Sequence, residues 1–291
     1  MVGPGPDQGK GPQMTALPGK TVVVTGAAGG IGRRMALKAA QQGATVVAWD
    51  IDGGRLDVLV KEIDDVAPGR GHSYVVDVTD ADLVTETARK VESEVGPVDV
   101  LILNAGVING KLIDELTDAE IRKTFDVNVL GLYWATRAFL PSMKQRRSGH
   151  IVTIASAAGL CGVVRQVDYS ATKHAAVGFA ESLRVELHRY APDLKTTLVC
   201  PYYINTGMFD GVKSKVGWLL PILEEQDVAN KVISAVERDK YELFMPWSVA
   251  TLPFLRGLPV RLFDRAMDIL GVHASMDEFH GRAQAEKKAT R

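Results

Sequence analysis

The sequence predicts a single α/β domain with a doubly wound parallel sheet. Short apolar runs rich in Val and Ile alternate along the chain with longer stretches whose apolar residues recur at helical spacing. The short runs are mainly apolar and do not alternate with charged residues, as in strands buried on both faces, and helical crossovers between such strands give a parallel sheet. A length of 291 residues suits one domain of this kind.

The expected strands are six apolar runs: Thr21–Thr25, Thr45–Trp49, Ser73–Val76, Val100–Leu103, His150–Ile154 and Thr196–Cys200. Helical periodicity predicts the segments between them: Gly32–Gln42, Gly54–Asp65, Ala81–Glu94, Asp118–Gln145 and Tyr169–Tyr190. This alternation stops near residue 207. We expect residues 1–18 to be a disordered leader and residues 19–206 to form the Rossmann-type domain. Residues 207–291, which are rich in Pro, Trp, Phe and Leu, are expected to form a helical lid and C-terminal extension of that domain.

The overall charge and the cysteines exclude several classes of protein. A net charge of −1 provides no basic field for nucleic acid. Cys161 and Cys200 form neither a disulfide framework nor a metal-binding spacing. No stretch reaches the roughly 18 to 20 apolar residues that span a bilayer. The sequence therefore predicts a cytoplasmic protein that uses no metal and binds no nucleic acid.

A glycine-rich turn follows the first expected strand and begins the first expected helix. Thr25–Gly32 reads TGAAGGIG. Gly26, Gly30 and Gly32, the last two flanking Ile31, stand where a tight turn, close approach to a pyrophosphate and close helix packing are needed. The helix N-terminus also presents unpaired N–H groups to phosphates. The strand-turn-helix context therefore predicts a dinucleotide site.

An acidic residue, Asp50, ends the second expected strand. A carboxylate at this place accepts hydrogen bonds from the ribose hydroxyls of an adenosine. Beside a 2′-phosphate it would cost on the order of 4 kcal/mol, for two unit charges about 4 Å apart at an effective dielectric near 20. We therefore expect NAD rather than NADP, unless Arg33, Arg34 or Arg55 neutralises such a phosphate.

Tyr169 and Lys173 lie one helical turn apart on the same face of an expected helix. Of the seven tyrosines, Tyr169 alone has a lysine four residues later. Ser156 precedes them, just after the expected strand His150–Ile154. A strand end and the following helix bring a hydroxyl and a phenol together at the carboxyl edge of the sheet, where ligands bind in open α/β folds. These three residues are the candidates for acid/base chemistry.

With these motifs in this order, residues 20–208 resemble the short-chain dehydrogenase/reductase family. The resemblance implies that TGAAGGIG is the cofactor loop and that Asp77 and Val78 contact the adenine. It assigns further cofactor and structural contacts to the NAG motif, the FDVNVLG motif and the PYYINT segment, which contain Asn104, Ala105, Gly106, Asn128, Pro201, Ile204 and Thr206. The sequence departs from the family pattern at Tyr202, where glycine is common.

The same resemblance implies the chemistry of four catalytic residues. Tyr169 takes the hydroxyl proton while hydride passes to the nicotinamide, and Ser156 holds the substrate oxygen. Lys173 binds the nicotinamide ribose, and Asn128 orders a water that relays protons to Lys173. The implied activity is that of an NAD-dependent short-chain alcohol dehydrogenase or carbonyl reductase. Helices Asp118–Gln145 and Tyr169–Tyr190, which pair in family members, imply a homodimer or homotetramer.

The C-terminal part resembles more narrowly the branch that contains retinol dehydrogenases and 17β-hydroxysteroid dehydrogenases. The resemblance rests on CPYYINTGMF, PILEEQDVANKVISAV and LGVHASMDEFHGR. Independently, the lid candidate Met208–Leu223 offers Phe209, Trp218, Leu219 and Leu220, each contributing roughly 1.5–3 kcal/mol when buried. We therefore expect a small hydrophobic alcohol or carbonyl substrate, although the same side chains would also suit a core or an oligomer contact.

Two other functions would use the same residues. An NAD-dependent epimerase or dehydratase also employs Tyr and Lys with bound cofactor, and a non-catalytic NAD-binding or scaffold protein would retain the cleft. The segment Tyr241–Leu270 carries apolar residues interleaved with Arg256, Arg261 and Arg265. Such a pattern suits either peripheral contact with an anionic membrane or burial in the lid or in an oligomer.

Overall fold

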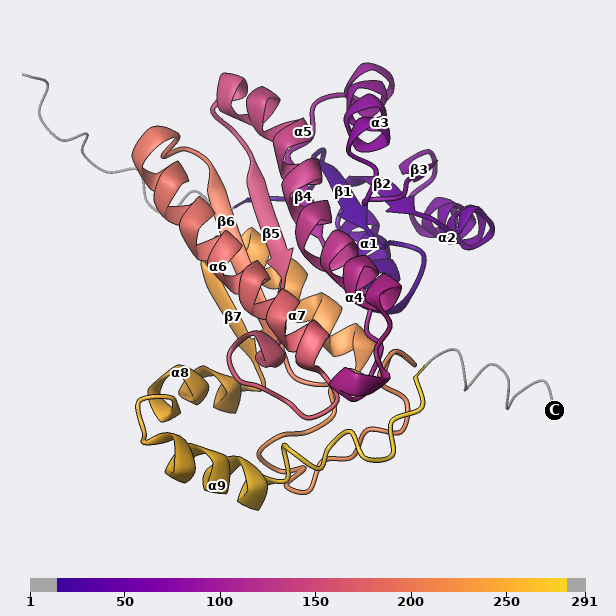
Figure 1. Ribbon diagram of the computed structural model, residues 1–291. Coiled ribbons are helices and arrows are strands. Elements are labelled where there is room, and N and C mark those ends of the chain that lie inside the picture. The colour runs from indigo at the N-terminus through magenta and orange to yellow at the C-terminus, as the bar shows by residue number, and fades with distance from the viewer. Residues whose placement is uncertain (1–14, 282–291) are drawn as a thin grey trace, which may run out of the picture.

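The structure, a computed structural model, describes residues 15–281. Its centre is a seven-stranded sheet in the order β3-β2-β1-β4-β5-β6-β7, in which every neighbouring pair is parallel (Figure 1). The strands are β1 (Thr21–Thr25), β2 (Thr45–Asp50), β3 (Gly71–Val75), β4 (Val100–Leu103), β5 (His150–Ile154), β6 (Lys195–Pro201) and β7 (Glu242–Met245). The strand order reverses direction between β1 and β4. The sheet is therefore doubly wound, as predicted.

Helices cover both faces of the sheet. The core of one face contains residues of α1 (Gly30–Gln41), α2 (Gly53–Val66) and α7 (Glu225–Glu237). The core of the other face contains residues of α3 (Ala81–Glu94), α5 (Gly131–Arg146) and α6 (Val167–Tyr190). Strands β1, β4 and β5 are buried along their whole length, which explains why their sequences consist mainly of Val, Ile and Leu.

Helix α3 illustrates how the local sequence sets an element. Asp80 caps it, because its carboxylate accepts hydrogen bonds from the N–H groups of Asp82 and Leu83. The side chains at four positions with helical spacing are buried against the sheet: Val84, Thr87, Ala88 and Val91. The cap and the apolar stripe together explain why the predicted and observed ends of this helix agree.

Several elements differ from the prediction by one or two residues at their ends, and two regions differ more. The helix expected over Asp118–Gln145 is α4 (Asp118–Phe125) followed by one π-helical turn, η2 (Asp126–Leu130), and then α5. The apolar spacing continues through such a turn, so the sequence gives no sign of it. A seventh strand, β7, was not predicted, because it is a four-residue edge strand whose first three residues are only partly buried or exposed. Helix α7 and strand β7 therefore continue the α/β domain into residues 207–291, which were expected to form only the lid and the C-terminal extension.

The remaining segments gather beyond the carboxyl ends of the strands (Figure 1). They include the short helices η1 (Ile113–Glu115), η3 (Ala157–Gly159) and η4 (Trp247–Thr251), then α8 (Leu252–Leu255) and α9 (Val260–Leu270). Residues of α8 and α9 share one small hydrophobic core with the loop residues Val216, Leu219 and Leu220. No helix among the described residues has the length and apolar content needed to cross a bilayer.

Residues 1–14 of the predicted leader lie outside the described residues. Its last residues do not behave as a leader: Leu17 is fully buried in the core that contains α1 and α7. The Thr15 hydroxyl donates to Asp239 at 2.5 Å, and the Thr15 N–H donates to the carbonyl of Glu237 at 3.1 Å. Thr15 and Leu17 therefore belong to the folded domain.

We expect Leu17→Ala to lower the free energy of unfolding by about 2–5 kcal/mol, because it leaves a cavity in a packed core. Val58, which is 53% exposed on α2, provides the matched control, and Val58→Ala should stay within roughly 0.5 kcal/mol of the wild type. Urea unfolding followed by circular dichroism measures both. Equal stability of Leu17→Ala and the control would contradict the assignment of Leu17 to the core.

Candidate active site

A cleft of about 720 Å³ lies at the carboxyl edge of the sheet. It brings together every site residue predicted from the sequence except Asn128: Gly26, Gly30, Ile31, Gly32, Asp50, Asp77, Val78, Asn104, Ala105, Gly106, Ser156, Tyr169, Lys173, Pro201, Ile204 and Thr206. The cleft spans the point between β1 and β4 where the strand order reverses. This is the place where open α/β sheets bind ligands.

Thr25 and Asn104 join the ends of β1 and β4 beneath the cleft. The Thr25 hydroxyl oxygen accepts the N–H groups of Asn104 at 2.9 Å and of Ala105 at 3.1 Å. In return, the Asn104 side-chain amide donates to the carbonyls of Thr25 at 2.9 Å and of Gly26 at 3.0 Å. The glycine-rich turn is thereby fixed to the NAG motif.

Two glycines of this turn, Gly26 and Gly32, stand where a side chain would not fit. A Cβ at Gly32 would lie 2.1 Å from the carbonyl oxygen of Gly26 and 2.6 Å from the amide nitrogen of Asn104. Gly26 itself has a φ of +64°, and a Cβ there would lie 2.9 Å from the Cα of Ala105. Any side chain at either position would push the turn away from β4, so the backbone stays open to a ligand.

Asp50 supports the same turn from β2. One carboxylate oxygen accepts the N–H of Ala28 at 2.9 Å and the other accepts the N–H of Asp52 at 3.1 Å. The three arginines that could offset its charge are engaged with other acids. Arg33 pairs with Glu62, Arg34 with Glu225 at 3.2 Å, and Arg55 with Asp52 at 3.3 Å. None of the three lines the cleft.

Ser156, Tyr169 and Lys173 meet at the inner end of the cleft. Ser156 follows β5 and caps η3, where its hydroxyl oxygen accepts the N–H of Ala158 at 3.1 Å. The first turns of α6 carry the other two side chains, which are both about 5% exposed. The Lys173 ammonium donates to the carbonyl of Ile154 at 2.9 Å and lies 5.5 Å from the centre of the Tyr169 ring.

Burial sets the protonation of both titratable groups. It raises the pKa of the Tyr169 phenol above its usual value of 10, and a hydrogen bond with Ser156 opposes this rise in part. Burial also lowers the pKa of Lys173 to about 8, since an ammonium loses hydration in the interior. The phenol is therefore neutral in the protein alone, and its ionisation requires further positive charge close by.

Asn128 does not line the cleft but supports it from the π-helical turn η2. Its side-chain oxygen accepts the N–H of Val107 at 2.8 Å, and its amide donates to the carbonyl of Val107 at 2.9 Å and to the Thr172 hydroxyl at 3.1 Å. A Cβ at Gly106 would lie 3.4 Å from the Asn128 oxygen and 3.7 Å from the Lys173 nitrogen. Gly106 thus leaves open the space between these two groups.

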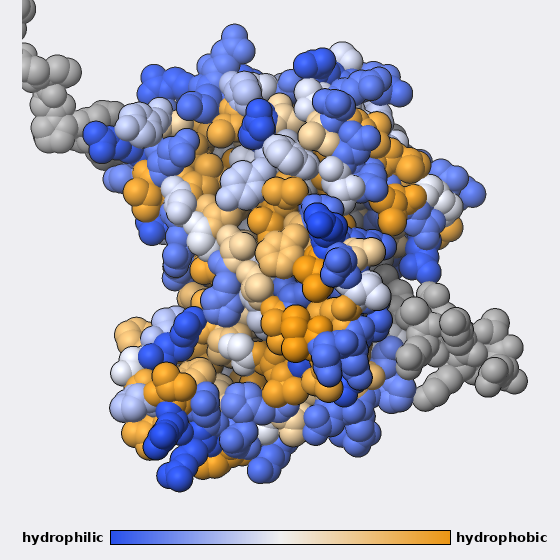
Figure 2. Space-filling model, in the orientation of Figure 1, coloured by the Kyte–Doolittle hydropathy of each residue, from blue (hydrophilic) through white to orange (hydrophobic). Residues whose placement is uncertain are grey.

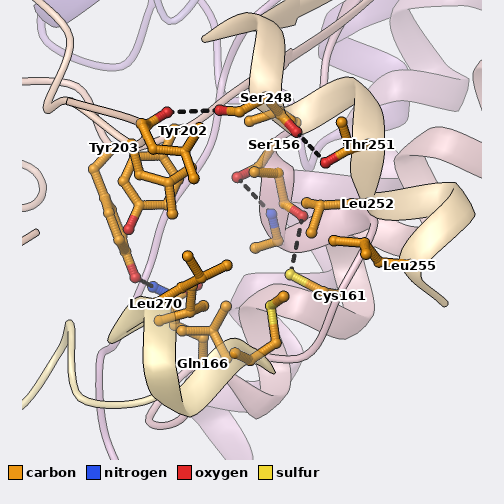
Figure 3. A pocket seen from close by; sticks show the side chains of 18 of the residues that line it. Ser156, Cys161, Gln166, Tyr202, Tyr203, Ser248, Thr251, Leu252, Leu255 and Leu270 are labelled. Carbon is orange, nitrogen blue, oxygen red and sulfur yellow. Dashed lines mark hydrogen bonds between the residues drawn. The ribbon is translucent and has the colours of Figure 1, made fainter. Parts of the chain in front are cut away.

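An apolar cavity adjoins the cleft (Figure 3). Ser156, Tyr202 and Phe209 line both spaces, so the cavity begins where the catalytic candidates meet. The opposite wall consists mainly of aliphatic side chains from the C-terminal helices, namely Leu252, Leu255, Met267 and Leu270. At its edge the Gln166 amide donates to the Tyr203 hydroxyl at 3.1 Å, and Ser275 lies 2.9 Å from that hydroxyl.

The residues predicted from the sequence to contact the substrate form only part of this cavity wall. Phe209, Leu219 and Leu220 of the lid candidate do line it, whereas Trp218 is 84% exposed. The contributions of α8 and α9 were missed, although the spacing of Phe263, Ala266, Met267 and Leu270 predicts one apolar helix face. Within residues 15–281, no group of three or more His, Cys, Asp or Glu side chains is arranged to hold a metal ion.

Comparison with known proteins agrees with this geometry. The family model of short chain dehydrogenases matches residues 20–217. Human epidermal retinol dehydrogenase 2 is 40% identical over 90% of this chain and 85% of its own length, and human estradiol 17-beta-dehydrogenase 11 is 37% identical over 84% and 81%. A crystal structure of a short chain dehydrogenase/reductase from Burkholderia phymatum in complex with NAD superposes with a TM-score of 0.76 at 27% identity, covering 86% of this chain and 96% of that one. The chain therefore belongs to the short-chain dehydrogenase/reductase family, in the branch of the retinol and 17β-hydroxysteroid dehydrogenases.

Proposed function

We propose that this oxidoreductase uses NAD(H) to interconvert a hydrophobic alcohol and its ketone or aldehyde. The observation that carries the proposal is the position of Ser156, which lines both the long cleft and the apolar cavity. A cofactor in the cleft and an apolar substrate in the cavity would meet beside its hydroxyl. Tyr169, whose ring lies in the same wall and contacts Phe209 at 6.0 Å between centroids, provides the acid/base there.

The cleft suits NAD. The glycine-rich turn accepts a pyrophosphate against backbone N–H groups at the start of α1, because Gly26 and Gly32 carry no side chains. Asp50 would accept the ribose hydroxyls and repel a 2′-phosphate. The ion pairs of Arg33, Arg34 and Arg55 support this choice, since each arginine is held by an acid outside the cleft. Asp77 and Val78 would contact the adenine, and Pro201, Ile204 and Thr206 the nicotinamide.

Proton transfer is assigned to Tyr169. Bound NAD supplies the hydride acceptor for oxidation, and NADH supplies the donor for reduction. The phenolate of Tyr169 would take the hydroxyl proton of the alcohol, and Ser156 would donate a hydrogen bond to the substrate oxygen. Shifting a phenol from its ordinary pKa of 10 to neutrality requires about 4 kcal/mol, and the burial of Tyr169 adds to that requirement. The Lys173 ammonium supplies part of this free energy, because its positive charge favours the phenolate. Asn128 would hold a water between itself and Lys173, and this water would return the proton to solvent.

The cavity favours an apolar substrate. Aliphatic and aromatic side chains form most of its wall, and each side chain that a ligand covers contributes roughly 1.5–3 kcal/mol. The named activities of the two human relatives, which are retinol and estradiol dehydrogenases, support a lipophilic alcohol of this kind.

We further propose a homodimer or homotetramer built on α4, α5 and α6. Figure 2 shows hydrophobic side chains gathered over these helices. They include Phe125, Tyr133 and Val185, which are 38%, 43% and 58% exposed, and Tyr133 packs edge-to-face against Phe179 across α5 and α6. An apolar helix pair of this kind suits an isologous contact with a second copy.

Tyr169→Phe should reduce kcat for alcohol oxidation by at least 10²- to 10⁴-fold, because the proton acceptor is lost. NADH binding, measured by nucleotide fluorescence, should persist. Tyr190→Phe is the matched control, since Tyr190 lies on the same helix but is 67% exposed. Retention of more than a few per cent of kcat by Tyr169→Phe would assign the acid/base role elsewhere.

The same assay decides between the proposed reaction and its alternatives. A screen of steroid, retinoid, aliphatic and aryl alcohols with NAD should give one NADH for each alcohol oxidised. An epimerase, a dehydratase or a scaffold protein would release no NADH in net turnover.

Cofactor selection provides an independent prediction. The wild type should have the higher kcat/KM with NAD, and Asp50→Ala should narrow the gap between NAD and NADP by roughly tenfold or more, since removal of like-charge repulsion is worth several kcal/mol. Because Asp50 also accepts the N–H of Ala28 in the turn, Asp50→Asn serves as the isosteric control. Wild-type preference for NADP would contradict the role of Asp50.

Assembly is tested by light scattering at micromolar concentration. The wild type should have the mass of a dimer or tetramer, and Tyr133→Glu should shift it towards monomer, because a buried unpaired charge destabilises an apolar interface. Val58→Glu on α2 should leave the mass unchanged. A monomeric wild type would be inconsistent with the proposed interface.

A further inference from the structure

One polar side chain in the wall of the apolar cavity is deeply buried but only partly used by the protein. Gln166 stands directly before α6, is 1% exposed and lines the cavity (Figure 3). Its amide nitrogen donates to the Tyr203 hydroxyl at 3.1 Å. Its amide oxygen accepts no hydrogen bond from any residue within 15–281, and it is not sealed by protein atoms, so it borders the open space of the cavity. Amide oxygens in the interior are rarely left without a partner, so this one indicates contact with a ligand.

The neighbouring hydroxyl groups cannot satisfy this oxygen by rotating. Ser275 has a single hydroxyl proton, which it donates to the carbonyl of Val272 at 2.6 Å. In the 2.9 Å hydrogen bond between Tyr203 and Ser275, the tyrosine is therefore the donor. The Tyr203 proton is thus used by Ser275, and the Tyr203 oxygen accepts the amide nitrogen of Gln166. This chain of hydrogen bonds has one direction, and it leaves the Gln166 oxygen and the second amide proton available to a ligand.

Two further hydroxyl groups of the wall are occupied by the protein itself. Ser248 donates to the carbonyl of Leu219 at 2.7 Å, and Thr251 donates to the carbonyl of Ser248 at 2.7 Å. Aliphatic and aromatic side chains form most of the remaining wall. In Figure 3 Gln166 lies on a part of the wall well apart from Ser156. The cavity therefore carries, away from Ser156, an amide that can both accept and donate a hydrogen bond.

We propose that Gln166 determines substrate specificity by binding a second oxygen function of an otherwise apolar alcohol or ketone. This inference rests on the proposed function, since it takes the reacting oxygen to lie at Ser156. The amide oxygen would accept a hydrogen bond from a second hydroxyl group, and the free amide proton would bind a carbonyl. An alcohol with a single oxygen would cover the amide with hydrocarbon and leave it without a partner, which disfavours binding of that alcohol. The preferred substrate is thus a lipophilic diol or hydroxy-ketone whose two oxygen functions are well separated.

Matched pairs of alcohols test this selection in the full chain. Androstanol is compared with androstanediol, and dodecanol with dodecanediol, the second hydroxyl group standing at the opposite end of the molecule. With NAD, the wild type should show a kcat/KM roughly 10- to 100-fold higher for the diol of at least one pair. Equal values within both pairs would overturn the role of Gln166.

A binding measurement separates this inference from the proposed function. The same ligands are titrated in the presence of NADH, where the alcohols bind without turnover, and the rise in melting temperature gives their Kd values. The diol should bind roughly tenfold or more tightly than the alcohol. If no alcohol is oxidised, the proposed function fails, and the ratio of Kd values alone decides the role of Gln166.

Gln166→Met keeps the length of the side chain and removes the amide, so it should lower the diol-to-alcohol ratio of kcat/KM by roughly tenfold or more. A packing defect would lower both values alike and leave the ratio unchanged, and that result would overturn the proposal. A cooperative melting transition followed by circular dichroism shows that each variant is folded.

Tyr203→Phe is the matched control, because it breaks the same hydrogen bond but retains the amide. It should keep most of the preference for the diol. An equal loss of preference in Tyr203→Phe would mean that the hydrogen-bonded chain sets the ratio and that the amide does not contact the substrate. Tyr202 lines the same wall, and its hydroxyl also has no partner within residues 15–281. Loss of the preference in Tyr202→Phe but not in Gln166→Met would assign the recognition to Tyr202 and overturn the role of Gln166.

Discussion

The hydrogen bonds between Thr25 and Asn104 hold the place where the sheet reverses its winding. Thr25 is only 2% exposed, and its single hydroxyl oxygen accepts two backbone N–H groups from the loop after β4. Each of these groups would cost about 1–3 kcal/mol if left without a partner in the interior. The glycine-rich turn, the NAG motif and the width of the cleft all depend on this junction, because it fixes the first and fourth strands to each other at their carboxyl ends.

A second constraint acts where Tyr169 and Lys173 meet in the cleft, because burial disfavours the charged form of both groups. Burial favours neutral Tyr169 and disfavours charged Lys173. The carbonyl of Ile154 offsets the second effect by accepting a hydrogen bond from the ammonium. Asn128 contributes indirectly, since its amide is occupied by Val107 and Thr172 and so joins the loop after β4 to α6. The π-helical turn aims Asn128 at that loop.

Most of the cleft could be predicted from the sequence because the predicted residues stand at a strand end or a helix start, unlike Arg122, Lys123, Asp126 and Val127 of α4 and η2, which the sequence analysis missed. Gly26, Asp50 and Ser156 follow apolar runs whose ends are unambiguous, and parallel strands bring such ends to one edge. The cavity could not be predicted in the same way, because its wall comes from segments distant in sequence. Gln166, Ser248 and Leu270 are brought together only by tertiary packing. Strand β7 was missed for a related reason: an edge strand lacks the uninterrupted apolar pattern of its buried neighbours.

The polypeptide that encloses the cavity has one more consequence. Apart from the loop after β5, its wall is supplied by the connection between β6 and α7 and by the residues that follow β7. Most of the cavity wall lies outside the two cores of the sheet, although Ala157 and Val249 belong to the core that contains α5 and α6, and Tyr202 and Leu252 pack against it. Ligand preference and global stability are thus encoded in largely separate stretches of chain. A lineage with this architecture can explore new substrates through changes in these stretches while the nucleotide cleft and the cores stay unaltered.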